Sequence, residues 1–197
     1  MAQPGRLVIL SGPSGAGKST VVRELIAGCS LPIVLSVSAT TRSPRPGEVD
    51  GRDYRFISCE EFARRRAAEE FLECKEVFGR GDWYGTLRSE VDAGLEAGRW
   101  VLLEIDVQGA LNVLEQRPST ISIFVHPGSP AELERRLRNR GTDSESAIAR
   151  RLQVAADEMT YIRRYDYEVI NQEVSQTVNQ ICKLLLQSQS QESEHNA

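Results

Sequence analysis

The sequence is poor in the residues that build metal centres. It contains two histidines and four cysteines, and no two cysteines form a Cys-x-x-Cys pair. A zinc site with the usual ligand spacing is therefore not visible. We expect the scattered cysteines to be reduced thiols, as in a cytoplasmic protein.

Long apolar runs and an excess of positive charge are also missing. No segment approaches the roughly 20 apolar residues of a membrane span, and the first residues lack the pattern of a signal peptide. The net charge of −4 argues against a general nucleic-acid surface. We therefore expect neither a membrane nor a nucleic-acid partner. The positive charge is almost entirely arginine, which suits phosphate recognition but equally fits a compositional bias.

One motif points to a class of ligand. The apolar run 7–10 is followed by the pattern G-x-x-x-x-G-K-S, which predicts a strand, a phosphate-binding loop and a helix. Glycines let such a loop turn its N–H groups inward. We expect Lys18 to reach the β- and γ-phosphates of a nucleotide and the Ser19 hydroxyl to ligate Mg²⁺. The residues expected to hold the phosphates are Gly12, Pro13, Ser14, Gly15, Ala16, Gly17, Lys18, Ser19 and Thr20.

Short apolar runs alternate with helical patterns over most of the chain. This alternation predicts an α/β fold with a parallel sheet flanked by helices. We expect strands at 7–10, 32–38, 100–106, 121–125 and 168–170, and helices at 18–27, 87–97 and 174–186.

Two stretches interrupt this rhythm. Residues 38–88 hold a polar loop, strand patterns at 54–57 and 71–78, a helix opened by Ser58 and Glu61, and a turn-rich return at 80–85. They predict an inserted mixed α/β subdomain. Residues 129–164 are helical and rich in arginine, with helices expected to begin at Ser129 and Thr142. The expected boundaries are core 1–37, insertion 38–88, core 89–128, helical segment 129–164, core 165–190 and disordered tail 191–197.

Two acids close the most strand-like run of the chain. Asp106 follows the apolar run 100–105, and Glu104 lies two residues earlier on the same face. In P-loop enzymes an acid at this place can orient Mg²⁺ or its waters. A helix N-cap is the alternative role for Asp106, and both roles stay open here.

The polar loop carries a second phosphate pattern. Arg42 and Arg45 lie three residues apart in a loop stiffened by prolines, and Glu48 follows. Two guanidinium groups close together suit a phosphate dianion, whereas a carboxylate suits N–H donors. A solvated charged loop is the simpler alternative.

Together these residues resemble the guanylate kinase family over nearly the whole chain. The P-loop alone is not specific, but the block Thr-Thr-Arg-x-Pro-Arg-x-Gly-Glu is. The resemblance rests on residues 12–20, 40–48, 51–54, 83–86, 105–109 and 140–142. It implies a core, a GMP-binding insertion and a mobile helical lid at 129–164. It also implies transfer of the ATP γ-phosphoryl group, with Mg²⁺, to GMP and dGMP.

The resemblance implies roles for single residues as well. The catalytic cations would be Lys18, Arg42, Arg136, Arg140 and Arg151. The GMP-binding residues would be Ser38, Arg42, Arg45, Glu48, Tyr54, Glu73, Tyr84, Thr86, Glu104 and Asp106, with Glu73 and Thr86 reading the guanine. Asn171 would contact adenine, and Ser19 and Asp106 would hold the metal, Asp106 directly or through water. The family usually has Asp at Glu104 and Ser at Thr86.

Two other functions fit parts of the sequence. A catalytically inactive guanylate-kinase-like module binds peptides, but such modules usually lack an intact P-loop, and the motif is intact here. A P-loop kinase acting on another small phosphorylated acceptor would not explain the arginine block together with Glu73 and Tyr84. The sequence leaves the oligomeric state open.

Overall fold

The central sheet has five strands, all paired in parallel, in the order β2-β7-β1-β8-β9. These are β1 (Arg6–Ser11), β2 (Ile33–Leu35), β7 (Trp100–Glu104), β8 (Ile121–His126) and β9 (Tyr167–Ile170). The structure is a computed structural model and describes residues 5–77, 81–139 and 144–195. The parallel α/β core predicted from the sequence is confirmed.

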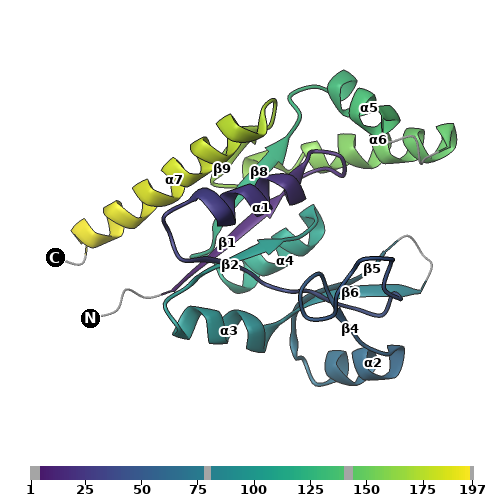
Figure 1. Ribbon diagram of the computed structural model, residues 1–197, viewed down its shortest axis with the longest axis horizontal. Helices are drawn as coiled ribbons and strands as arrows, with labels where there is room; N and C mark the ends of the chain where they lie inside the picture. Colours follow the sequence, from purple (N-terminus) through teal and green to yellow (C-terminus); the bar gives the residue numbers. More distant parts are fainter. Residues whose placement is uncertain (1–4, 78–80, 140–143, 196–197) are drawn as a thin grey trace.

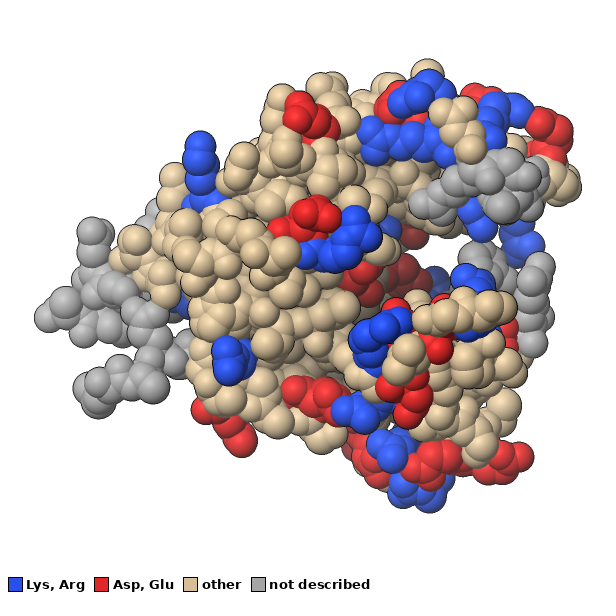
Figure 2. All heavy atoms as spheres, in the orientation of Figure 1, with Lys and Arg blue, Asp and Glu red and all other residues tan. Residues whose placement is uncertain are grey.

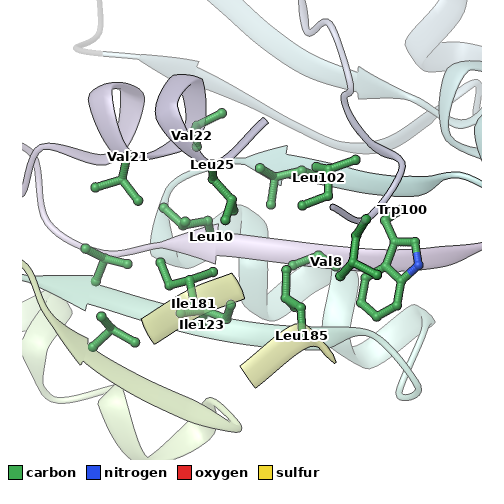
Figure 3. Packing of buried hydrophobic residues seen from close by; sticks show 14 residues of the cluster. Val8, Leu10, Val21, Val22, Leu25, Trp100, Leu102, Ile123, Ile181 and Leu185 are labelled. Carbon is green, nitrogen blue, oxygen red and sulfur yellow. The ribbon is translucent and has the colours of Figure 1, made fainter. Parts of the chain in front are cut away.

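Helices cover both faces of this sheet (Figure 1). Helices α1 (Lys18–Gly28) and α7 (Val174–His195) pack on one face, and α3 (Arg88–Glu96) and α4 (Val107–Gln116) on the other. In β1, Val8 and Leu10 point toward α1 and α7 (Figure 3). Leu7 and Ile9 belong to the cluster on the other face. Because the strand is buried on both sides, its sequence is continuously apolar.

A second sheet lies to one side of the core, in the order β4-β3-β6-β5. Its strands are β3 (Ala39–Thr40), β4 (Arg55–Phe56), β5 (Phe71–Val77) and β6 (Asp82–Leu87), and helix α2 (Cys59–Ala67) packs on it. The rings of Phe62 and Phe71 stack at 4.4 Å between helix and sheet. The expected turn at 80–85 is wrong over its described part, since β6 pairs with both β3 and β5 there.

Two further helices, α5 (Pro130–Asn139) and α6 (Glu145–Met159), project from the core (Figure 1). Leu133 and Leu137 of α5 pack against Ala155 of α6. A short 3-10 helix, η1 (Ile162–Arg164), leads back to β9. Ser144 caps α6 by accepting a hydrogen bond from the N–H of Ala147. The capping residue expected from the sequence, Thr142, lies outside the described residues.

Two expectations need correction. Cys29, at the end of α1, and Cys182, in α7, form a disulfide, whereas Cys59 and Cys74 are free. The two cysteines are 153 positions apart in the sequence, so no local pattern indicates the bond, and the packing of α1 on α7 brings their Cα atoms to 5.8 Å. The expected disordered tail is helical as far as His195, because α7 continues nine residues beyond Leu186. None of the helices in the described ranges is long and apolar enough to cross a membrane.

Candidate active site

The loop between β1 and α1 closes around the side chain of Lys18. Its Nζ donates hydrogen bonds to the carbonyl oxygens of Gly12 and Pro13, at 2.6 and 3.0 Å. Gly12 has φ 135°, and a Cβ there would lie 2.0 Å from the carbonyl oxygen of Val125 in β8. Only glycine fits at this point. Residues 12–20 thus form the loop and the first turn of α1, as the motif predicts.

Two acids lie at the carboxyl end of β7. Ser19 Oγ donates a 2.6 Å hydrogen bond to Glu104 Oε1. Asp106 Oδ1 accepts from the N–H of Gly109 at 2.8 Å and caps α4, while Oδ2 lies 2.9 Å from Lys75 Nζ. The N-cap role left open for Asp106 is therefore real. Glu104, expected among the GMP-binding residues, contacts the P-loop serine.

Arg42 is the centre of a cluster on the second sheet. Its Nε donates to the Tyr84 hydroxyl and its Nη2 to Glu48 Oε1, both at 2.9 Å. The guanidinium carbon lies 5.4 Å from the ring centroid of Tyr54. The hydrogen bond to Glu48 raises the pKa of Arg42, and the same bond, with one from the N–H of Arg45, lowers the pKa of Glu48. Both groups therefore stay charged near neutral pH.

Arg45 bonds to this cluster through its backbone, whereas Ser38 bonds to Arg55 in β4. The Arg45 side chain is exposed, and its N–H donates to Glu48 Oε2 at 2.7 Å. Ser38 directly precedes β3 and is half-buried. Its carbonyl oxygen accepts from the N–H of Arg55 at 2.9 Å. The backbone of Arg45 therefore belongs to the Arg42 cluster, and Ser38 pairs with the residue that follows Tyr54.

Glu73 and Thr86 face each other across β5 and β6. Thr86 Oγ1 donates a 2.7 Å hydrogen bond to Glu73 Oε1. Burial raises the pKa of Glu73 to about 7, and the charge of Asp106 adds to the shift. A carboxyl group with one hydroxyl partner can accept further hydrogen bonds from a ligand. The structure brings this predicted pair together.

Sequence reasoning missed two charged residues of the site. Lys75 lies two residues after Glu73 in β5, and its ion pair with Asp106 joins the second sheet to the core. Its alternation with Glu73 and the scarcity of lysine were the only available signals. Glu158, in α6, has its pKa raised to about 7 by burial, while the charge of Lys18 opposes the shift. Nothing local marks Glu158, because its surroundings depend on how α6 packs.

Arg136 connects α5 to the P-loop region. Its Nε donates to Glu132 Oε1 and its Nη2 to the carbonyl oxygen of Asn171, both at 2.7 Å. Arg151 is half-buried in α6. Arg140 lies outside the described residues. The Nη1 of Arg136 also lies 3.5 Å from the carbonyl oxygen of Ala16, so the structure places Arg136 next to the P-loop.

Asn171, expected to contact adenine, lies directly after β9 and is buried. It is only 2% exposed. Its Nδ2 donates to the carbonyl oxygen of Ala16 at 2.7 Å, and its Oδ1 accepts from Thr177 Oγ1 at 3.0 Å. Both ends of the amide are therefore bonded inside the protein, and the contact of Asn171 with adenine stays a prediction.

A cavity of about 470 Å³ opens beside Asn171. Its lining includes Gly128, Arg136, Ile170 and the exposed Gln172. A hollow separates α5 and α6 from the second sheet, with charged side chains of both signs around it (Figure 2). The P-loop belongs to the core, and the Arg42 cluster belongs to the second sheet. The ion pair between Lys75 and Asp106 joins these two units.

Comparison with known proteins identifies the family. A family profile for guanylate kinase matches residues 4–188. The guanylate kinase of Rhodopirellula baltica is 62% identical over 188 residues, covering 94% of this chain and 89% of that protein. The crystal structure of guanylate kinase from Anaplasma phagocytophilum is 36% identical with a TM-score of 0.75, covering 95% of this chain and 87% of that one. A gluconokinase from Sinorhizobium meliloti, 16% identical with a TM-score of 0.55, shares the fold alone. The chain belongs to the guanylate kinase family.

Proposed function

We propose that the protein transfers the γ-phosphoryl group of ATP to GMP, giving ADP and GDP. One observation carries the proposal: an intact P-loop and a separate Arg42 cluster occupy the same molecule, joined through Lys75 and Asp106. Two phosphate-binding centres suit two phosphorylated substrates, because transfer needs a donor and an acceptor held together.

The P-loop would bind the donor. Lys18 and the inward N–H groups of the loop would neutralise the β- and γ-phosphates of ATP. The cavity beside Gly128, Ile170 and Gln172 would take the base, since it has an apolar wall and an exposed amide. Arg136, which also lines it, reaches the carbonyl oxygen of Ala16 in the loop at 3.5 Å.

The second sheet would bind the acceptor. Arg42 and Arg45, with the Tyr54 and Tyr84 hydroxyls and Ser38, would hold the phosphate of GMP. The Arg42 fork is already oriented by Glu48 and Tyr84, so little side-chain entropy remains to be lost on binding.

Glu73 would read the base. Guanine presents N1–H and a 2-amino group, and a carboxylate can accept from both. Thr86 fixes one oxygen of Glu73. Adenine has an acceptor at N1, and the mismatch leaves a buried charge unpaired at a cost of about 1–3 kcal/mol or more.

The residues at the end of β7 fit Mg²⁺. Ser19 Oγ and Glu104 Oε1 lie together at 2.6 Å, and Mg²⁺ prefers oxygen ligands supplied partly by substrate phosphates. The described ranges hold no group of three or more acidic, histidine or cysteine side chains that could bind a metal ion. When bound, Mg²⁺ neutralises charge on the transferring phosphates. Asp106, with both oxygens bonded to protein groups, would act on the ion through water at most.

The reaction also needs positive charge to stabilise the transferring phosphates. The phosphate of GMP is already an oxyanion, so no general base is needed. Arg136, Arg140 and Arg151 would approach the phosphates when α5 and α6 close over the hollow, which also excludes water and discourages hydrolysis of ATP.

A coupled assay of ADP release tests the proposal. ATP and Mg²⁺ are supplied with GMP, dGMP, AMP, CMP or UMP in turn. We expect turnover with GMP and dGMP at least a hundredfold above that with AMP. Absence of turnover with GMP would favour the alternative, an inactive protein-binding module of the same fold.

A further inference from the structure

Asn171 occupies a buried crossing point between the P-loop, β8, α5 and α7. Its backbone N–H donates to the carbonyl oxygen of His126 at 2.8 Å, and its backbone oxygen accepts from Arg136 Nη2 at 2.7 Å. Its side-chain amide lies between Ala16 and Thr177. Each polar group of this residue is therefore matched inside the protein, as a buried amide requires.

Chemistry sets the orientation of the amide. The carbonyl oxygen of Ala16 can only accept, so the atom 2.7 Å away must be Nδ2. The Thr177 hydroxyl then donates to Oδ1 at 3.0 Å. An aspartate would place an oxygen against the Ala16 carbonyl, and a side chain without an amide would leave that carbonyl without this donor.

We propose that Asn171 is a positioning residue that orients the P-loop for ATP, a role that rests on the proposed function. The peptide between Ala16 and Gly17 is planar and trans, so its C=O and N–H point in opposite directions. Because Asn171 holds the Ala16 carbonyl, the N–H of Gly17 must point away from Asn171. That direction is toward the phosphates in the arrangement proposed above.

Gly17 provides a second observation. It has φ +86°, and a Cβ there would lie 2.6 Å from Asn171 Nδ2. The amide therefore packs directly on the loop where only glycine leaves room. The loop and the residue that follows β9 therefore pack directly against each other at this point.

Arg136 cannot replace this anchor. Its Nη1 reaches the Ala16 carbonyl at 3.5 Å, compared with 2.7 Å for Asn171 Nδ2. Arg136 also belongs to α5, which the proposed closure moves. Asn171 belongs to the core, so its hold on Ala16 persists whether or not the lid is closed.

Binding titrations with ATP·Mg²⁺ and with GMP, each alone, test the proposal without requiring turnover. We expect Asn171→Asp to weaken ATP at least tenfold and GMP less than twofold. Thr177→Val, which removes the hydroxyl that holds Oδ1, should weaken ATP in the same direction by a smaller factor. Thr177→Ser keeps the hydroxyl and should restore wild-type affinity.

Thr120→Val is the matched control. Thr120 is also buried, and its hydroxyl has no hydrogen-bond partner among the described residues, so both affinities should be unchanged. The proposal is overturned if ATP and GMP weaken equally, if neither changes, or if Thr177→Ser behaves like Thr177→Val. If Asn171→Asp fails to fold, the ATP affinities of Thr177→Val and Thr177→Ser test the proposal instead. A wild type that binds ATP but does not phosphorylate GMP would refute the proposed function and leave this test intact.

Discussion

Replacing Glu73 with glutamine should stabilise the protein at pH 8 and change its stability little at pH 4.5. Burial raises the pKa of Glu73 from the usual 4.5 to about 7. The folded state then binds this proton more tightly than the unfolded state. The stability that the group contributes is present below about pH 4.5 and is lost as the pH rises through about 7.

The size of the effect follows from the shift. A difference of about 2.5 pKa units corresponds to about 3 kcal/mol at most. Glutamine keeps an oxygen for the Thr86 hydroxyl but carries no charge to desolvate. For a protein of this length, 3 kcal/mol raises the melting temperature by roughly 6–12 °C.

Thermal unfolding of wild type and Glu73→Gln at pH 4.5, 6 and 8 measures this difference. Glu115→Gln, at an exposed glutamate of α4, serves as the control and should show no comparable gain at pH 8. An equal gain at every pH would refute the linkage argument, since it would mean that the charge of Glu73 is not the cause. The same variant should bind GMP more weakly relative to AMP.

Other changes have equally direct outcomes. Arg42→Ala should raise KM for GMP at least a hundredfold with little change in KM for ATP, as measured by steady-state kinetics with each substrate varied in turn. Arg42→Lys should not restore the KM for GMP, because lysine lacks the fork that contacts Glu48 and Tyr84. An unchanged KM for GMP in Arg42→Ala would contradict this role. GMP affinity should fall as the pH drops below about 7, because Glu73 then protonates; a flat titration between pH 5.5 and 8 would contradict this. Thiol titration of the unfolded protein without reductant should find two thiols, since Cys29 and Cys182 are bonded; four would refute the disulfide. Cys182→Ser should melt at a lower temperature than wild type without reductant and match it with reductant, whereas Cys59→Ser should match wild type throughout.

The features that the sequence predicts well are local ones. The P-loop is encoded in nine consecutive residues, with glycine at Gly12 and Gly17 required by positive φ and close neighbours. The central strands are recognisable because burial on both faces demands continuous apolar runs. The Ser58 cap is likewise set within four residues.

The features that cannot be predicted from the sequence depend on tertiary packing. The segment 82–87 contains turn-forming residues and becomes a strand only because β3 and β5 flank it. Asn171 lies 155 residues from Ala16, its hydrogen-bond partner, and a pattern search cannot distinguish a buried amide from one that contacts a ligand. Glu104 contacts Ser19 because β7 pairs beside β1.

The fate of the γ-phosphate distinguishes transfer to GMP from hydrolysis of ATP. ATP labelled at the γ-phosphate is incubated with Mg²⁺, GMP and the protein, and the products are separated. Transfer to GMP predicts labelled GDP in an amount equal to the ADP formed, with little labelled inorganic phosphate. Labelled inorganic phosphate without labelled GDP would show hydrolysis rather than transfer and would contradict it.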